Sequence, residues 1–363
     1  MKHILALFIV LLCLLTLFSC DTTKQQPLLE DLSLPQEDHL EWSELFSSNY
    51  TATPLETDST CMIGVIDKIK KFNNEYYIAS SGSSIHRFNN EGKHVMSLNK
   101  KGQGPEEYIH VEDFDIYSIN GQTEIWISDY ENLKIYDANN GSFLRKISFP
   151  FTIYKFKRME NGHLLLVTGQ NDHFLTLTDE QGNILSEYLE KEVPFLLFRA
   201  VQFVKYKNEY LFQLGMSNSY VSFNPETETF SRGVYTPQND YLTDQQLIEL
   251  YSTFGIDFIR EANNGTHLSN IIPLGNTLWL QIRHADKNYL SKLDNGKMTS
   301  TEFTYGSFLS TISVGDSENS LLLYLQPDQL QEIPQKLTNK QGQEIQCQID
   351  DNPVIVEFFN NYV

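Results

Sequence analysis

A repeated hairpin unit dominates the chain, and its clearest copy spans residues 124–147. Three short apolar and aromatic runs, at 125–127, 133–136 and 143–147, are separated by two turns. The Asn and Gly residues of these turns tolerate the left-handed backbone that a tight hairpin requires. One ribbon of this size cannot bury both of its faces alone, so the unit must pack against neighbouring copies.

Related units recur along the chain at intervals of roughly 40 to 50 residues. Their first apolar runs lie at residues 76–79, 125–127, 164–167, 210–212, 278–280 and 321–324. In most units a second and a third run follow across short polar turns, and a further run precedes the first. The chain is therefore predicted to be all-β, a six-bladed β-propeller with four-stranded blades.

The two ends of the repeat array are expected to meet in one blade. The sixth unit is one strand short, because a polar stretch at 327–351 interrupts it before an apolar run at 353–359. Residues 49–55 can supply the missing strand. This pairing would close the ring and remove the sheet edges that an open array leaves exposed.

One helix is predicted within the array, at residues 243–254. Leu247, Leu250, Tyr251 and Phe254 recur at helical spacing, and Thr243 with Gln246 fits a capping box. The helix is expected to lie on one face of the ring. Packing against the propeller explains it, and a role as a lid or partner contact stays open.

The first twenty residues predict export. Lys2 precedes an apolar run at 4–18, and Cys20 follows two residues after the run. The run is too short for a membrane-spanning helix, and it has only a single basic residue beside it. The sequence before Cys20 resembles the lipobox of bacterial lipoproteins. The resemblance implies removal of a signal peptide, residues 1–19, and acylation of Cys20 with fatty acids such as palmitate. An uncleaved anchor or an ordinary secretory signal is the alternative.

A polar segment follows Cys20, and residues 20–39 are predicted to form a flexible stalk. The propeller domain is then expected to span residues 40–363. Several acyl chains on Cys20 would make a stable membrane anchor. We favour the outer membrane over the inner membrane. The residues after Cys20 lack the acidic cluster that we associate with export to the cell surface.

The charge of the chain argues against nucleic acid as a partner. Its formal net charge is −20, and such a field repels phosphate backbones and anionic lipid head groups. The acidity is consistent with the solubility of a tethered domain. Recognition of a cationic ligand is the alternative.

Two cysteines remain for the folded domain. Cys13 lies in the signal and Cys20 is expected to carry lipid, which leaves Cys61 and Cys347. Export would allow a disulfide between them. A bridge and two free thiols both stay open, because the sequence gives no distance.

Three further stretches carry a family resemblance: Pro54-Leu55-Glu56-Thr57, the KGQGPEEY loop at 101–108 and the ending DNPVIV at 351–356. With the repeats, they make residues 40–363 resemble the six-bladed β-propeller lipoproteins of Gram-negative bacteria. Single blades are also similar to NHL-type repeats. Glu106 departs from the family, where glycine is common. The resemblance implies an envelope-anchored domain of unassigned activity.

The loop at 101–108 contributes the first candidate binding residues, namely Gly102, Gly104, Pro105, Glu107 and Tyr108. It lacks the third glycine and the following helix of a phosphate-binding loop. Flexible glycines and a stiffening proline favour a structural role, with Tyr108 packed between the first two blades. Because the loop leads into an inner strand, its tip is expected to border the central channel, where it could bind a ligand.

Asp113 and Asp115 are the second candidate group. They alternate along a predicted inner strand, so both side chains can point into the channel. Paired carboxylates could bind calcium or act as acid and base, whereas a solvated acidic channel needs neither. The histidines show no metal-binding spacing, and Gly315-Asp316-Ser317 is interpreted as a turn. No metal and no cofactor are predicted.

Two functions follow from these features. The first is a lipid-anchored, non-catalytic module of the cell envelope that binds or scaffolds a protein, peptide or glycan. The second is a hydrolase or lyase with its site in the central channel around Asp113 and Asp115. An enzyme should bring several acidic, basic or amide side chains together in a pocket.

Overall fold

The computed structural model describes residues 49–191, 197–234, 241–274, 277–284, 287–294, 297–302, 314–317, 320–333 and 336–359. The predicted signal peptide at 1–19, Cys20 and the predicted stalk at 20–39 lie outside the described residues.

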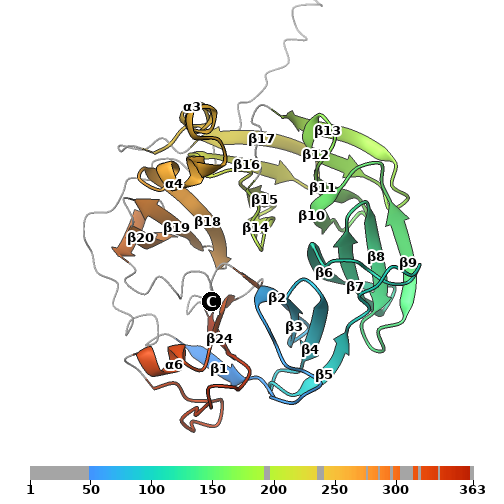
Figure 1. The fold of residues 1–363 in the computed structure, drawn as a ribbon, viewed down its shortest axis with the longest axis vertical. Coiled ribbons are helices and arrows are strands. Elements are labelled where there is room, and N and C mark those ends of the chain that lie inside the picture. The colour runs from blue at the N-terminus through green and yellow to red at the C-terminus, as the bar shows by residue number, and fades with distance from the viewer. Residues whose placement is uncertain are drawn as a thin grey trace, which may run out of the picture.

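Six sheets are arranged around a central axis, as the predicted propeller requires (Figure 1). In each of the first five blades, four strands run antiparallel in chain order, with the first strand nearest the axis. The strands are β2 Ile66–Phe72, β3 Glu75–Ser80, β4 Ser84–Phe88 and β5 His94–Leu98; β6 Asp113–Ile119, β7 Gln122–Asp129, β8 Asn132–Asp137 and β9 Phe143–Ser148; β10 Ile153–Arg158, β11 Leu164–Thr168, β12 His173–Thr178 and β13 Ile184–Glu190; β14 Val204–Tyr206, β15 Glu209–Phe212, β16 Ser219–Asn224 and β17 Thr229–Val234; β18 Thr266–Leu274, β19 Thr277–His284, β20 Lys287–Asp294 and β21 Lys297–Glu302.

The sixth blade joins the two ends of the array. Its described strands are β23 Ser320–Leu325, β24 Val354–Phe359 and β1 Tyr50–Pro54, and β24 lies between the other two. β1 pairs antiparallel with β24, with Ala52 opposite Val356. The predicted closure of the ring by an amino-terminal strand is therefore confirmed.

The segment Gly315–Asp316 is a short strand, β22, which pairs in parallel with β2 at Ile69 and Lys70. The interpretation of this segment as a turn is wrong. A Cβ atom at Gly315 would lie 2.0 Å from the carbonyl oxygen of Leu322. Only glycine allows this close approach of two backbones.

The alternation of side chains between the two faces of each strand explains why the blades pack as a ring. On β7, Ile125 and Ile127 join a core cluster shared with the first blade, whereas Trp126 joins a cluster shared with the third blade. Successive side chains of a strand point to opposite faces of the sheet. Both faces of this blade are thus buried against neighbours, and Trp126 and Ile135 are inter-blade packing residues.

The predicted inserted helix is confirmed between β17 and β18. α3 spans Asp244–Phe254 and continues through η2 Gly255–Asp257 into α4 Phe258–Ala262. Thr243 caps α3 in a capping box with Gln246. Leu247 is buried in a cluster with Met216 and Phe258, so the apolar side of the helix packs on the propeller.

A further short helix, α6 Gln329–Glu332, lies within the polar stretch between β23 and β24. Within the described ranges, no helix has both the length and the apolar character needed to cross a membrane.

Candidate functional site

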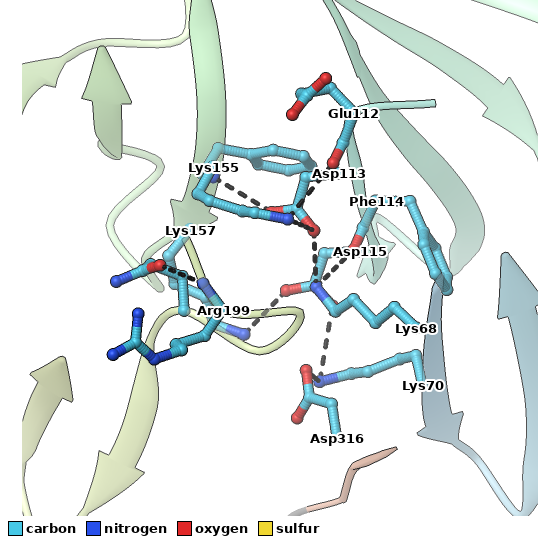
Figure 2. Close-up of polar contacts among 12 residues, drawn as sticks. Lys68, Lys70, Glu112, Asp113, Phe114, Asp115, Lys155, Lys157, Arg199 and Asp316 are labelled. Atoms are coloured by element: carbon cyan, nitrogen blue, oxygen red, sulfur yellow. Dashed lines mark hydrogen bonds and ion pairs between the residues drawn. The ribbon is translucent and has the colours of Figure 1, made fainter. Parts of the chain in front are cut away.

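The inner strands of the first three blades place an alternating pair of charged residues at the central channel (Figure 2). Alternate residues of a strand share one face, so both members of each pair point the same way. The pairs are Lys68 and Lys70 on β2, Asp113 and Asp115 on β6, and Lys155 and Lys157 on β10.

Asp113 is shared by two lysines. Its carboxylate lies 2.9 Å from the Lys68 ammonium and 3.9 Å from that of Lys155. Lys68 also donates a hydrogen bond of 2.8 Å to the carbonyl oxygen of Phe114. Lys155 donates one of 3.3 Å to the carbonyl oxygen of Glu112.

Asp115 forms the second half of the network. It lies 2.7 Å from the Lys157 ammonium and 3.5 Å from that of Lys70. Lys70 is 2.9 Å from Asp316 on β22, which brings a third carboxylate into the channel from the far end of the chain. The Tyr117 hydroxyl donates a hydrogen bond of 2.9 Å to Asp115.

The expectation of a solvated acidic channel is wrong. Asp113 and Asp115 do point towards the channel (Figure 2), but they are only 5% and 2% exposed. Within the described part of the channel, their negative charge is matched by four lysines. The channel of the first three blades is therefore filled by a buried ion-pair network.

The electrostatics of this network do not suit acid–base catalysis. Burial alone would raise the pKa of Asp115, but the ammonium groups of Lys157, Lys70 and Lys68 outweigh it and hold that pKa well below its usual range. A general base works best when its pKa lies near the working pH. Asp115 is instead a fixed counter-charge for the surrounding lysines.

The loop at 101–108 is held by its own side chains. Tyr108 is fully buried between the first two blades, and its hydroxyl donates to the carbonyl oxygen of Ser83 at 2.8 Å. The backbone N–H of Gly104 donates to the Glu107 carboxylate at 2.8 Å. A Cβ atom at Gly102 would lie 1.9 Å from that carboxylate, so glycine leaves room for it.

The tip of this loop lies over β8. Tyr136 donates a hydrogen bond of 3.0 Å to the carbonyl oxygen of Glu106, and Lys134 donates one to that of Glu107. Both donors belong to β8, the third strand from the axis. The expectation that the tip borders the central channel is therefore wrong. Pro105 is exposed at this tip.

A separate cavity of about 90 Å³ lies where the third and fourth blades meet the start of α3. Its apolar lining residues are Phe174, Leu189, Leu214, Tyr220, Val221 and Leu247, and its polar lining residues are Glu190, Ser219, Arg232 and Asp244, with Gly215. The sequence predicted α3 but not this cavity, because the lining comes from five elements and a loop. The only local signal was the interruption of the repeat by a helix.

His267 on β18 is a buried group that sequence reasoning missed. It is 4% exposed, and its Nδ1 atom has no hydrogen-bond partner among the described residues. Burial, with Arg283 and Arg199 nearby, lowers the pKa of His267 to about 4. The imidazole is thus neutral in the folded protein at pH values where it is charged in the unfolded chain.

This difference predicts a pH-dependent stability. Between pH 6.5 and 4 the unfolded chain binds the proton and the folded protein does not, so stability is lost as the pH falls. We expect His267 to remove about 2 kcal/mol of unfolding free energy between pH 7 and 5. Urea unfolding of the His267→Gln variant should show a shallower pH dependence. Parallel profiles for the two proteins would contradict this assignment.

Cys61 and Cys347 are both free, so the structure contains no disulfide between them. Cys61 is buried and Cys347 is partly buried. Burial raises the pKa of both thiols. Across the described ranges, no three His, Cys, Asp or Glu residues lie close enough together to hold a metal ion.

The sheet order, the closing strand and the filled channel define a six-bladed β-propeller. The chain belongs to the DUF4934 family, a domain of unknown function, whose profile matches residues 31–358. No curated protein matches the chain.

One solved structure supports the fold, and two others show a weaker similarity. A candidate exported protein from Bacteroides fragilis has a TM-score of 0.72 at 16% identity, covering 90% of this chain and 98% of that one. A protein of unknown function from Bacteroides caccae has a TM-score of 0.41 at 13% identity, covering 66% and 81%. A luciferin-regenerating enzyme has a TM-score of 0.47 at 6% identity, covering 86% and 96%. At 16% identity, the similarity to the Bacteroides fragilis protein concerns the fold alone.

Proposed function

We propose that this protein is a lipid-anchored module of the cell envelope that binds a protein, peptide or glycan without catalysing a reaction. One contrast carries the proposal. The charged groups of the channel are paired with one another, whereas the cavity beside α3 is lined by apolar side chains together with a few polar ones. Ligand sites commonly combine apolar walls with a few polar groups.

The paired channel also weighs against the alternative of a hydrolase or lyase. Such an enzyme needs an acid or base whose proton can move at the working pH. Asp115 is held ionised by the lysines around it, and Asp113 is bonded to Lys68 at 2.9 Å. The binding role therefore has the better support from the geometry.

The proposed binding face is the surface around α3, beside the cavity. It can be tested with a photo-crosslinking amino acid in living cells. Ser252 is exposed on α3, and Glu226 is exposed in the turn between β16 and β17, which precedes β17 whereas α3 follows it. We expect a discrete crosslinked partner from position 252 and none from position 226. Equal crosslinking at both positions, or none at position 252, would contradict a binding face around α3.

The anchor rests on Cys20 and the apolar run before it. We expect the Cys20→Ala variant to lose its acyl groups and to leave the membrane fraction, since several acyl chains are needed for stable anchoring. Mass spectrometry of the mature amino terminus and membrane fractionation measure both effects. The wild-type protein should sediment with the outer membrane. Retention of the variant in membranes would contradict lipid anchoring.

A further inference from the structure

The cavity beside α3 has room for one side-chain-sized apolar group. A volume of about 90 Å³ is several times what one ordered water needs, which is about 10–15 Å³ on this measure. Phe174 and Tyr220 supply aromatic walls, and Leu214, Val221 and Leu247 supply aliphatic ones. An aromatic ring or a branched alkyl group would gain from leaving water here.

One of the two carboxylates that line the cavity is already neutralised. Asp244, at the first turn of α3, forms an ion pair with Arg232. The Ser219 hydroxyl also donates to Asp244, at 3.1 Å. The charges of Asp244 and Arg232 therefore cancel, and the pair as a whole presents no net charge to a ligand.

Glu190 is the other carboxylate. It lies at the end of β13, where its backbone pairs opposite His173. Its side chain is exposed, and its carboxylate forms no hydrogen bond or ion pair with any described residue. The lining residues that the structure describes therefore have a net charge of −1, within a protein of net charge −20. Such a field attracts cations and repels anions.

We propose that this cavity binds a primary ammonium group attached to a hydrophobic body, with the apolar part in the cavity and the ammonium beside Glu190. This inference rests on the proposed binding function and names its ligand class. The amino-terminal residue of a peptide and a free arylalkylamine share this chemistry. The carboxylate of Glu190 supplies charge selection, and the walls supply most of the contact area.

Three small probes separate charge from shape. Phenethylamine carries the ring and an ammonium, phenylacetate carries the ring and a carboxylate, and N-acetylphenethylamine carries the ring without charge. We expect ligand-observed NMR titration to show that phenethylamine binds and that phenylacetate binds at least tenfold more weakly. A Phe-Gly-Gly peptide with a free amino terminus, compared with its N-acetyl form, tests whether a peptide is the source.

Two variants test whether the probes bind in this cavity and beside Glu190. Glu190→Gln should weaken phenethylamine about fivefold, the upper end for an exposed ion pair, while Glu226→Gln, matched in charge, should change nothing. Gly215→Leu should abolish binding of all three probes, because a Cβ atom there has its nearest neighbour, the Ser217 nitrogen, at 4.0 Å. The new side chain can therefore occupy the cavity without displacing the backbone.

The outcomes distinguish the ligand class from the proposed function. Equal binding of the ammonium and carboxylate probes, or equal effects of the two glutamate variants, would overturn the ammonium preference and leave a binding cavity. No binding of any probe would overturn the ligand class as well. If Gly215→Leu also left the crosslink at position 252 unchanged, the cavity would not be the site of the proposed function.

Discussion

Replacing Asp115 with Asn should lower the free energy of unfolding by about 3–5 kcal/mol. The variant keeps the size of the side chain but removes a buried carboxylate that lies 2.7 Å from Lys157 and 3.5 Å from Lys70. The Lys70 side chain is 6% exposed and that of Lys157 is 17% exposed, so neither ammonium can become fully hydrated without opening the channel. A buried ammonium without its counter-charge destabilises the folded state more than replacement of the whole ion pair by apolar groups does. Urea unfolding at pH 7 measures the loss.

A second substitution should recover part of this stability. Lys157→Met removes the ammonium that Asp115 neutralises and keeps a side chain of similar length. In the double variant we expect a coupling energy of more than about 1 kcal/mol, as is usual for residues in direct contact. The exposed Glu226→Gln variant serves as the charge control and should be near neutral. Additive effects of the two channel substitutions would contradict a direct ion pair.

The difference in stability between wild type and Asp115→Asn should depend on pH with a defined sign. The pKa of Asp115 is lowered in the folded protein, so the stability it contributes is present above the pKa of an unfolded aspartate, about 4. That stability is lost progressively as the pH falls below about 4 towards the lower folded value. The difference between wild type and Asp115→Asn should therefore stay constant from pH 7 to 5.

The fold was predictable because its signals are local. Each hairpin unit carries its own turns and alternating apolar runs, and the unit at 124–147 corresponds to β7, β8 and β9. The helix α3 was predictable for the same reason, since Thr243 and Gln246 are three residues apart and cap it together. The missing strand of the sixth blade then left only one arrangement that closed the ring.

The ion-pair network was only half predictable. Asp113 and Asp115 were identified, but the lysines that neutralise them were not, because Lys68 is 45 residues from Asp113 in the chain. A signal was present in the sequence: the inner strands of three successive units read Lys-x-Lys, Asp-x-Asp and Lys-x-Lys. Aligning the units by strand would have placed these pairs side by side. Asp316, on a two-residue strand, had no such signal.

The cavity beside α3 was not predictable from local patterns. Its walls come from β12, β13, β16, β17, the loop before β16 and the first turns of α3. Glu190 looks like an ordinary exposed residue at the end of an outer strand. Only the packing of α3 against the fourth blade, through Leu247 and Met216, brings these segments together.

Deleting the closing strand, residues 49–55, should abolish the cooperative unfolding transition of the domain at 25 °C. β1 buries Ala52, and Leu55 just after it is 4% exposed. The backbone pairs with β24 along its whole length, from Tyr50 opposite Phe358 to Pro54 opposite Val354. The deletion removes burial worth about 1.5–3 kcal/mol for each large side chain. It also removes backbone hydrogen bonds worth about 1 kcal/mol each. Together these losses approach the total stability of a typical domain, about 5–15 kcal/mol.

A milder variant tests the same contact without removing it. Gly92 has φ of 77°, and a Cβ atom there would lie 2.0 Å from the carbonyl oxygen of Pro54 in β1. Gly92→Ala should therefore force β1 away and cost about 1–3 kcal/mol, because glycine is needed both for its positive φ and for the close approach. Deletion of residues 21–39, the predicted stalk, is the control and should leave thermal melting unchanged. A domain that melts normally without residues 49–55 would contradict closure by β1, because the ring would then be stable with the edge of β24 exposed.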